Sequence, residues 1–242
     1  MTGTAQTAAI ARDLAPTGVL RASINLGNPV LAQGTPDAPR GVTVDIARAV
    51  GERLGVPVEL VCFDAARRSF EAMVTGEADL CFLAVDPARA TEVAFTAPYV
   101  VIEGVYVVPV DSPVRSVADV DRAGVRVGVK QGSAYDLFLT RTLAHAGIIR
   151  GDEGVDVFVT ESLEVGAGIR EPVTAFAAGR VDVRLVDEAF MQIEQAVGTT
   201  RTREAATVAF LHDLVEELKA SGFVAEALTR SGQVGAAVAP PA

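Results

Sequence analysis

Three segments of the sequence combine charged or hydroxyl side chains with the features of a helix start, a combination suited to binding a small anion. The first is Asp86-Pro87-Ala88-Arg89. A guanidinium presents a fixed fork of N–H donors that matches a carboxylate. Aspartate followed by proline predicts a helix start, whose N–H groups also attract anions. We predict that Arg89 binds a carboxylate; in the alternative, it is a surface residue paired with Glu92. Asp86 is predicted first as the helix cap, and a cap at this turn could also contact the ligand.

The second segment is Lys130-Gln131-Gly132-Ser133-Ala134. Here a strand is predicted to turn through glycine into a helix, which makes a second cradle for an anion. Ser133 is either a ligand contact or an ordinary N-cap, and the two roles are compatible. The Lys130 side chain points either to this predicted anion site or to solvent.

The third segment is Arg170-Glu171-Pro172, at the start of another predicted helix. If Arg170 faces a ligand site, an ammonium group beside it is disfavoured, because like charges repel strongly where water is excluded. The ligand would then be a small mono- or dicarboxylate, or an amino acid whose amine is held by Glu171. In the alternative, Arg170 is a solvated residue at the helix start.

Strands and helices are predicted to alternate over the first hundred residues. Strands at 19–25, 58–63 and 79–85 are separated by helices at 44–54 and 66–75, and short links between such elements indicate parallel β-α-β units. The 58–63 run is apolar apart from Glu59, which is typical of a strand covered on both faces. Ligands of such sheets bind at the carboxyl ends of the strands, which places the backbone of Leu83 and Ala84 in the same site as Arg89.

The pattern then restarts after a β-rich run that ends at Val110. Strands at 125–129, 163–169 and 181–186 alternate with helices at 134–146 and 172–178, and a β-like run at 190–197 precedes helices at 203–220 and 223–230. The phrase Gly76-Glu-Ala-Asp-Leu is echoed by Gly179-Arg-Val-Asp-Val. The predicted fold class is therefore α/β with two lobes, each a mainly parallel sheet flanked by helices. Residues 1–106 and 196–242 form one lobe and 107–195 the other, with two crossover strands as a hinge and a ligand cleft between the lobes.

Composition excludes several classes of protein. The chain has 242 residues, of which 50% are hydrophobic, and 21 basic against 31 acidic residues give a net charge of −10. This charge disfavours nucleic acid as a partner, and the apolar runs are far shorter than the roughly 20 residues of a membrane-spanning helix. The two cysteines, Cys62 and Cys81, are too few for a disulfide framework and fit reduced thiols in the core. Their spacing and the presence of only two histidines exclude a zinc site. We expect a monomer without cofactor or metal.

Several motifs, taken in order, resemble one known family: the extracellular solute-binding proteins of ABC transporters, in the polar amino-acid group (family 3). The matching phrases, over residues 18–232, are Gly41-Val-Thr-Val-Asp45-Ile-Ala, Gly76–Asp79, Arg89 followed by Phe95-Thr-Ala-Pro-Tyr99, Val127-Gly-Val-Lys-Gln-Gly-Ser133 and Leu218-Lys-Ala-Ser-Gly222-Phe. The resemblance implies a type II periplasmic-binding-protein fold with strand order 2-1-3-n-4 in each lobe. Strands 2 and 3 are not neighbours in that order, which argues against a Cys62–Cys81 disulfide. The resemblance also implies that Arg89, the Ser133 hydroxyl and the Ala134 N–H hold the ligand carboxylate.

Two segments depart from the family pattern. Where its amino-acid binders have an aspartate for the ligand's amino group, this chain has Arg170, and a different alignment would use Asp187. The loop after the first strand often places an aromatic side chain over the ligand, whereas this loop offers only Asn25, Asn28 and Pro29, of which we take Asn28 as the candidate contact. Tyr135 is the best aromatic candidate, although a residue in the first turn of a helix is more often part of the core.

The expected function is capture of a small carboxylate or amino-acid-like ligand for an ABC transporter, without catalysis. Residues 1–18 lack the basic and apolar regions of a signal peptide, so the protein is either cytoplasmic or has lost its signal. A removed signal would place it in the periplasm or outside the cell. One alternative function is a cytoplasmic sensor of the same fold. Another is a dehydratase-like enzyme, for which Glu171 is the only candidate general acid.

Overall fold

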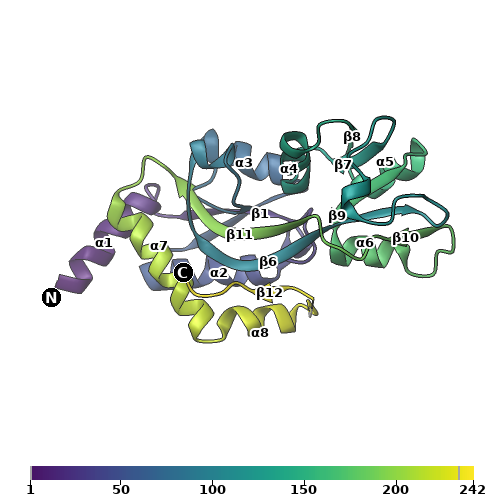
Figure 1. Cartoon of the computed structure of the whole chain (residues 1–242). Helices are drawn as coiled ribbons and strands as arrows, with labels where there is room; N and C mark the ends of the chain where they lie inside the picture. Colours follow the sequence, from purple (N-terminus) through teal and green to yellow (C-terminus); the bar gives the residue numbers. More distant parts are fainter. Residues whose placement is uncertain (1, 234) are drawn as a thin grey trace. The chain divides into compact units, whose positions relative to one another are not determined.

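The computed structural model describes residues 2–233 and 235–242, and the chain divides into two compact units (Figure 1). Unit 1 comprises Met1–Val101 and Glu194–Ala242, and unit 2 comprises Ile102–Ile193. Two strands, β6 (Val93–Pro109) and β11 (Met191–Thr200), carry the chain from one unit to the other.

Unit 1 is built around one sheet in the order β4-β1-β5-β11-β6, with β12 paired to β6. Strand β1 is parallel to β4 and β5, and β11 is antiparallel to β5. Its other elements are α1 (Thr2–Leu14), β1 (Leu20–Asn25), β2 (Gln33–Thr35), β3 (Ala38–Arg40), α2 (Val42–Leu54), β4 (Val58–Phe63), α3 (Ala66–Val74), β5 (Leu80–Ala84), a 3-10 helix (Arg89–Thr91), α7 (Ala205–Ala220), α8 (Phe223–Arg230) and β12 (Ala237–Val238).

Helices cover both faces of the unit 1 sheet: α3 lies on one side, and α2 and α8 lie on the other (Figure 1). The central strand β1 is consequently buried, and Leu20, Ala22 and Ile24 have no exposed surface. Burying each of the larger side chains contributes about 1.5–3 kcal/mol. The apolar residues of α2 recur at helical spacing and are buried, and Gly55 ends this helix in the left-handed conformation (φ 67°), as the sequence predicted.

Unit 2 repeats the same strand order on a smaller scale. Its sheet runs β8-β7-β9-β6, with β10 on the other edge of β6. Strand β7 is parallel to β8 and β9. Its elements are a 3-10 helix (Val117–Asp119), β7 (Arg126–Lys130), α4 (Ala134–Thr142), β8 (Gly147–Gly151), α5 (Gly154–Thr160), β9 (Val165–Ile169), α6 (Arg170–Ala177) and β10 (Val183–Leu185). Both sheets have the predicted 2-1-3-n-4 order, so the predicted fold class is confirmed.

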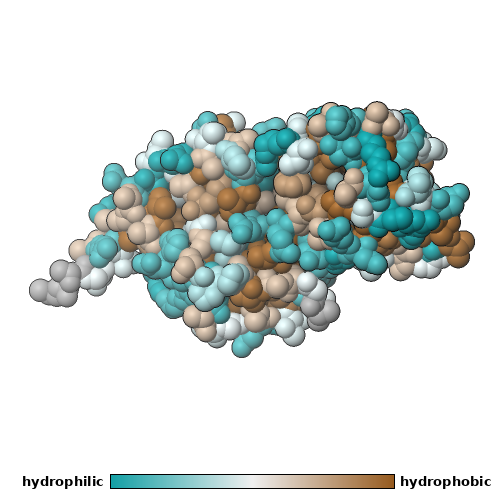
Figure 2. Space-filling model, in the orientation of Figure 1, coloured by the Kyte–Doolittle hydropathy of each residue, from teal (hydrophilic) through white to brown (hydrophobic). Residues whose placement is uncertain are grey.

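The core of unit 2 lies between its sheet and the helices α5 and α6. Val105 and Val107 of β6, Phe158 of α5 and Val173 of α6 form one buried cluster. Hydrophobic residues also reach the surface of this unit near β10 (Figure 2), where Val181 is 89% exposed and Val110 is 49% exposed. Among the described residues, no helix is both long and apolar enough to cross a membrane.

Several local predictions were wrong, each for a physical reason. The helix predicted at 134–146 ends at Thr142, because the Asp121 carboxylate accepts hydrogen bonds from the N–H groups of Ala144, His145 and Ala146 at 2.7–3.0 Å. These bonds hold the chain in a turn that leads into β8. Strand β4 has a helix against each face, α2 and α3, as predicted, but it is an edge strand and its residues are mostly half-buried.

Among the described residues, six helices and strands were not predicted: α1, β2, β3, β8, α5 and β12. The 3-10 helix Val117–Asp119 was not predicted either. Helix α1 packs at the start of α7, where Asp13 replaces a local cap. Its carboxylate accepts hydrogen bonds from the Glu204 N–H at 3.0 Å and the Thr207 hydroxyl at 2.6 Å. A cap supplied from almost two hundred residues away leaves no local signal in the sequence.

Candidate ligand-binding site

The unit 1 candidates lie where β5 ends and the chain turns into the 3-10 helix Arg89–Thr91. The Asp86 carboxylate accepts a hydrogen bond from the Ala88 N–H at 2.8 Å, and its carbonyl accepts one from the Ala90 N–H at 2.9 Å. Asp86 therefore caps this turn as predicted. The predicted α-helix is absent, however, and the short 3-10 helix that replaces it is too brief to offer an anion the N-terminus of an α-helix.

Arg89 is buried within this turn, with only 3% of its surface exposed. Its Nη1 donates to the Ala84 carbonyl at 3.2 Å. Burial lowers the pKa of the guanidinium, and the nearby Asp86 carboxylate opposes that effect. Because an arginine remains charged even so, the turn holds a fixed positive charge in low-dielectric surroundings. Such a charge attracts an anion much more strongly than an exposed arginine does.

The backbone of Leu83 and Ala84 is fixed by the sheet. Both residues pair with β11, and both are at least 97% buried. The Leu83 side chain belongs to the core cluster that contains Cys81, and burial raises the pKa of the Cys81 thiol to about 12. Cys81 and the half-buried Cys62 are both free thiols. Ala84 positions the arginine through its carbonyl, and Leu83 packs the sheet beneath it.

Asn28 is 6% exposed and organises the loop after β1. Its side-chain oxygen accepts a hydrogen bond from the Val30 N–H at 3.3 Å, and its carbonyl accepts bonds from Leu31 and Ala32 at 3.0 Å. These contacts give Asn28 a turn-forming role in the structure. Its contact with a ligand remains a prediction.

In unit 2, the turn from β7 into α4 is fixed by two reciprocal hydrogen bonds. The Ser133 hydroxyl accepts from the Asp136 N–H at 3.0 Å, and the Asp136 carboxylate accepts from the Gly132 N–H at 2.8 Å. Gly132 has φ 69°, a left-handed conformation that favours glycine. The protein's own carboxylate thus occupies part of the predicted cradle. The Ser133 hydroxyl also forms a side-chain hydrogen bond with Tyr135.

Asp136 is 3% exposed and was missed by the sequence analysis. The Arg150 Nε donates to its two carboxylate oxygens at 3.0 and 3.1 Å, so its charge is neutralised at the start of α4. The signal for Asp136 was available, because an acidic residue three positions after a serine cap is the spacing of a capping box. Arg150 belongs to β8, an element that was not predicted, and had no comparable signal.

The other two residues of this segment have different surroundings. Lys130 forms an ion pair with Glu153 at the start of α5, and 12% of its side chain is exposed. The pair reduces the attraction of Lys130 for an anion. Ala134 is the first residue of α4 and is half-buried. Its neighbour Tyr135 is 5% exposed, and burial raises the pKa of its hydroxyl, as expected for a core residue.

Arg170 and Glu171 are the first two residues of α6 and have contrasting partners. Arg170 forms an ion pair with Glu103 of β6, and its Nη2 donates to the Asp187 carbonyl at 3.1 Å. It is therefore not simply solvated, although 32% of its side chain is exposed. The Glu171 Oε2 atom is buried and has no hydrogen-bond partner among the described residues. Glu103 was missed by the sequence analysis.

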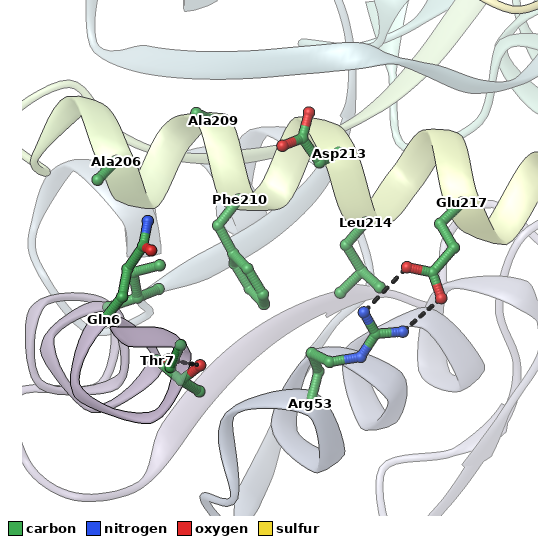
Figure 3. A pocket seen from close by; sticks show the side chains of 11 residues that line it. Gln6, Thr7, Arg53, Ala206, Ala209, Phe210, Asp213, Leu214 and Glu217 are labelled. Atoms are coloured by element: carbon green, nitrogen blue, oxygen red, sulfur yellow. Dashed lines mark hydrogen bonds and ion pairs between the residues drawn. The ribbon is translucent and has the colours of Figure 1, made fainter. Parts of the chain in front are cut away.

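Two cavities in the described part of unit 1 are lined by none of the predicted site residues. One, of about 310 Å³, lies between α1, α2 and α7 (Figure 3). Phe210 and Leu214 line it, and Arg53 and Glu217 on its wall neutralise each other through hydrogen bonds of 2.9 and 2.5 Å. The other, of about 380 Å³, borders the turn after β5 and includes Arg201, whose Nη1 donates to the Ala90 carbonyl at 2.8 Å. Within the described residues, no group of three or more His, Cys, Asp or Glu side chains is arranged to hold a metal ion.

Three solved structures illustrate what the fold is similar to. A putative binding component of an ABC transporter from Wolinella succinogenes, complexed with lysine, is 19% identical with TM-score 0.73, and the match covers 88% of this chain and 95% of that one. The amino acid ABC transporter substrate-binding protein AbpA from Streptococcus pneumoniae, bound to L-arginine, is 17% identical with TM-score 0.73, covering 90% and 96%. The ancestral amino acid-binding protein AncCDT-1, a precursor of cyclohexadienyl dehydratase, is 21% identical with TM-score 0.71, covering 89% and 96%.

None of the curated proteins is similar enough in sequence to match. A family model does match, and it covers residues 25–232, which include every predicted site residue. The strand order of both units and the structural neighbours agree with that match. This chain belongs to the bacterial extracellular solute-binding proteins, family 3.

Proposed function

We propose that this protein captures a small solute that carries a carboxylate and an amino group, and delivers it to an ABC transporter outside the cytoplasm. The observation that carries the proposal is Arg89, a guanidinium 3% exposed at the carboxyl end of β5. A guanidinium matches a carboxylate in charge and shape, and its attraction for an anion is strong where little water reaches it.

Unit 2 supplies a second set of candidate contacts. Ser133 and Ala134 stand at the start of α4, where an N-terminal dipole and a hydroxyl donor both favour an anion. The buried Glu171 oxygen, which lacks a partner among the described residues, suits an ammonium donor. The structural neighbours that hold lysine or arginine support a ligand with both groups.

The test is thermal unfolding with a panel of amino acids, dicarboxylates, keto acids and aromatic acids. A ligand at 100 times its dissociation constant adds about 2.7 kcal/mol to the stability of the native state. For a chain of this size that corresponds to a rise in melting temperature of roughly 5–10 °C. Arg89→Gln should abolish the rise, whereas Arg68→Gln, which changes an exposed arginine of α3 in the same unit, should preserve it.

Ser133→Asp provides the sharpest test in unit 2. An aspartate can still accept the Asp136 N–H, so the cap and the melting temperature of the free protein should be kept. Its negative charge should repel a ligand carboxylate and abolish the rise. If no carboxylate raises the melting temperature of the wild type, or if Arg89→Gln and Ser133→Asp both bind normally, the proposal is wrong.

A second candidate function is a dehydratase-like reaction, favoured by the same Glu171 oxygen. A carboxyl group with a buried and unpartnered oxygen can donate a proton as a general acid. The ancestral precursor of cyclohexadienyl dehydratase shares the fold. Incubation with a cyclic carboxylate that has a hydroxyl leaving group decides between the two: product formation that is lost in Glu171→Gln supports the enzyme, and unchanged substrate supports the binding protein.

A further inference from the structure

Two opposite charges stand side by side at the start of α6, and only one of them is compensated by the protein. The Arg170 guanidinium is held by the Glu103 carboxylate and the Asp187 carbonyl. The adjacent Glu171 carboxylate has a buried Oε2 with no hydrogen-bond partner in the part of the chain that the structure describes. The charges of Arg170, Glu103 and Glu171 sum to one negative charge. The Glu103 carboxylate pairs with Arg170, so the remaining negative charge is that of Glu171.

The position of Glu103 follows from the pairing of two strands. Strands β6 and β9 are antiparallel, and their register places Gly104 opposite Ile169. Continuing this register by one position, past the end of β9, brings Glu103 opposite Arg170, the first residue of α6, and the two side chains form an ion pair. Because both strands belong to the sheet of unit 2, the Glu103 carboxylate is fixed beside Arg170 whether or not a ligand is bound.

We propose that Glu103 is a positioning residue that sets the charge preference of the ligand site. By binding Arg170, Glu103 keeps the guanidinium from attracting a second ligand carboxylate and leaves Glu171 as the uncompensated charge. The site then takes solutes that carry an ammonium group beside their carboxylate and rejects dicarboxylates. This inference rests on the proposed function, and it reverses the sequence-based argument that Arg170 disfavours an ammonium ligand.

The test compares two probes of similar length, L-glutamine and glutarate, together with L-arginine, by isothermal titration calorimetry. The wild type should bind at least one of the amino acids more tightly than glutarate. Glu103→Gln removes the carboxylate that holds Arg170. The ratio of the affinity for the preferred amino acid to the affinity for glutarate should then fall by at least tenfold. Glu171→Gln should weaken the amino acid at least tenfold and leave glutarate unchanged or slightly improved.

Two further variants separate charge from structure. The double variant Glu103→Gln/Arg170→Gln removes both members of the pair and should return the ratio toward that of the wild type. Glu164→Gln is the matched control, because Glu164 also pairs with an arginine in unit 2 and is similarly exposed (39% against 36% for Glu103). It should leave the ratio unchanged.

The outcomes distinguish this inference from the proposed function. If Glu103→Gln weakens every probe by the same factor, its role is merely structural and the inference is wrong, although binding that depends on Arg89 would keep the proposed function intact. A wild type that prefers glutarate also overturns the inference. If none of the panel compounds binds the wild type, the proposed function fails and the inference fails with it.

Discussion

The first strand of each sheet starts with the same arginine–carboxylate contact, and the two contacts differ in burial. In unit 1, the backbone N–H, Nε and Nη2 of Arg21 donate to the Asp79 carboxylate at 3.1, 2.9 and 2.8 Å. In unit 2, the same three groups of Arg126 donate to the Glu164 carboxylate at 2.9 Å each. The Asp79 side chain is 1% exposed, whereas the Glu164 side chain is 39% exposed.

A second arginine widens the difference between the two contacts. The Arg203 Nη2 also donates to the Asp79 carboxylate at 3.1 Å, and its Nη1 binds the Asp13 carbonyl at the end of α1. Asp79 therefore compensates two guanidinium groups that water reaches poorly, and it connects the sheet to α1 and the start of α7. Glu164 compensates one guanidinium that is 44% exposed. The two arginine–carboxylate contacts have similar hydrogen bonds, but the Asp79 contact should stabilise unit 1 strongly and the Glu164 contact should stabilise unit 2 weakly.

Asp79→Asn should have the largest effect. Removing one partner from a buried ion pair typically costs about 3–5 kcal/mol, because the remaining charge stays buried without compensation. We expect a loss of stability in this range, measured by urea unfolding. Asp182→Asn is the matched control, because Asp182 pairs with Arg180 at the surface and is 61% exposed. A loss below about 1 kcal/mol for Asp79→Asn would show that burial does not decide the difference.

Asp121 of unit 2 shows what a half-buried carboxylate contributes through backbone hydrogen bonds. The N–H groups of Ala144, Ala146 and His145 lower its pKa to about 2, below the usual value of about 3.9. Since the folded pKa is depressed, the stabilisation is complete above the unfolded pKa and is lost as the pH falls toward 2. The difference in melting temperature between wild type and Asp121→Asn should therefore shrink between pH 5 and pH 2. A difference that stays constant over this range contradicts the assignment.

Glu164→Gln should have a much smaller effect than Asp79→Asn. The hydrogen bond to Arg126 lowers the pKa of Glu164, but the exposure of both side chains screens their attraction. Exposed pairs of this kind contribute about 0.2–1 kcal/mol, and salt weakens them further. Urea unfolding at low salt and at high salt should show a small loss that decreases as salt is added. A loss above about 2 kcal/mol would mean that the unit 2 contact is as important as the unit 1 contact.

Much of the fold was predictable because its signals are local. Apolar runs, glycine stops and short links predicted most strands and helices, and the family resemblance supplied the strand order. The structural counterpart of the Asp79 contact was not predictable in this way. The repeated phrase aligns Asp79 with Asp182, which pairs with Arg180. The contact equivalent to that of Asp79 is instead made by Glu164, which follows Ser162. Only the pairing of β7 with β9 identifies it.

The candidate site was predictable as a list of residues but not as a set of partners. Motif spacing identified Arg89, Ser133 and Arg170, each beside a turn or a helix start. It did not show that Arg170 is bound by Glu103, because that contact joins residues 67 positions apart in the sequence. The Arg170–Glu103 pair therefore bears on the ligand class predicted from Arg170, which the sequence argument weighed without this partner.

Ser162→Gly should produce the smallest change and refines the comparison between the units. The turn before each carboxylate contains a residue in the left-handed conformation, Gly76 (φ 75°) in unit 1 and Ser162 (φ 48°) in unit 2. The carbonyl of each residue accepts a hydrogen bond from the arginine of its unit, at 2.8 Å from Arg21 and at 2.7 Å from Arg126.

The left-handed conformation costs a residue with a side chain about 1–2 kcal/mol, and the greater freedom of glycine in the unfolded chain offsets part of that cost. Ser162→Gly should therefore raise the free energy of unfolding by at most about 1 kcal/mol, and Gly76→Ser should lower it by a similar amount. Urea unfolding of both variants checks the sign: if Ser162→Gly destabilises the protein, the serine side chain holds the turn in a way that the glycine of unit 1 does not, and the two turns are not equivalent.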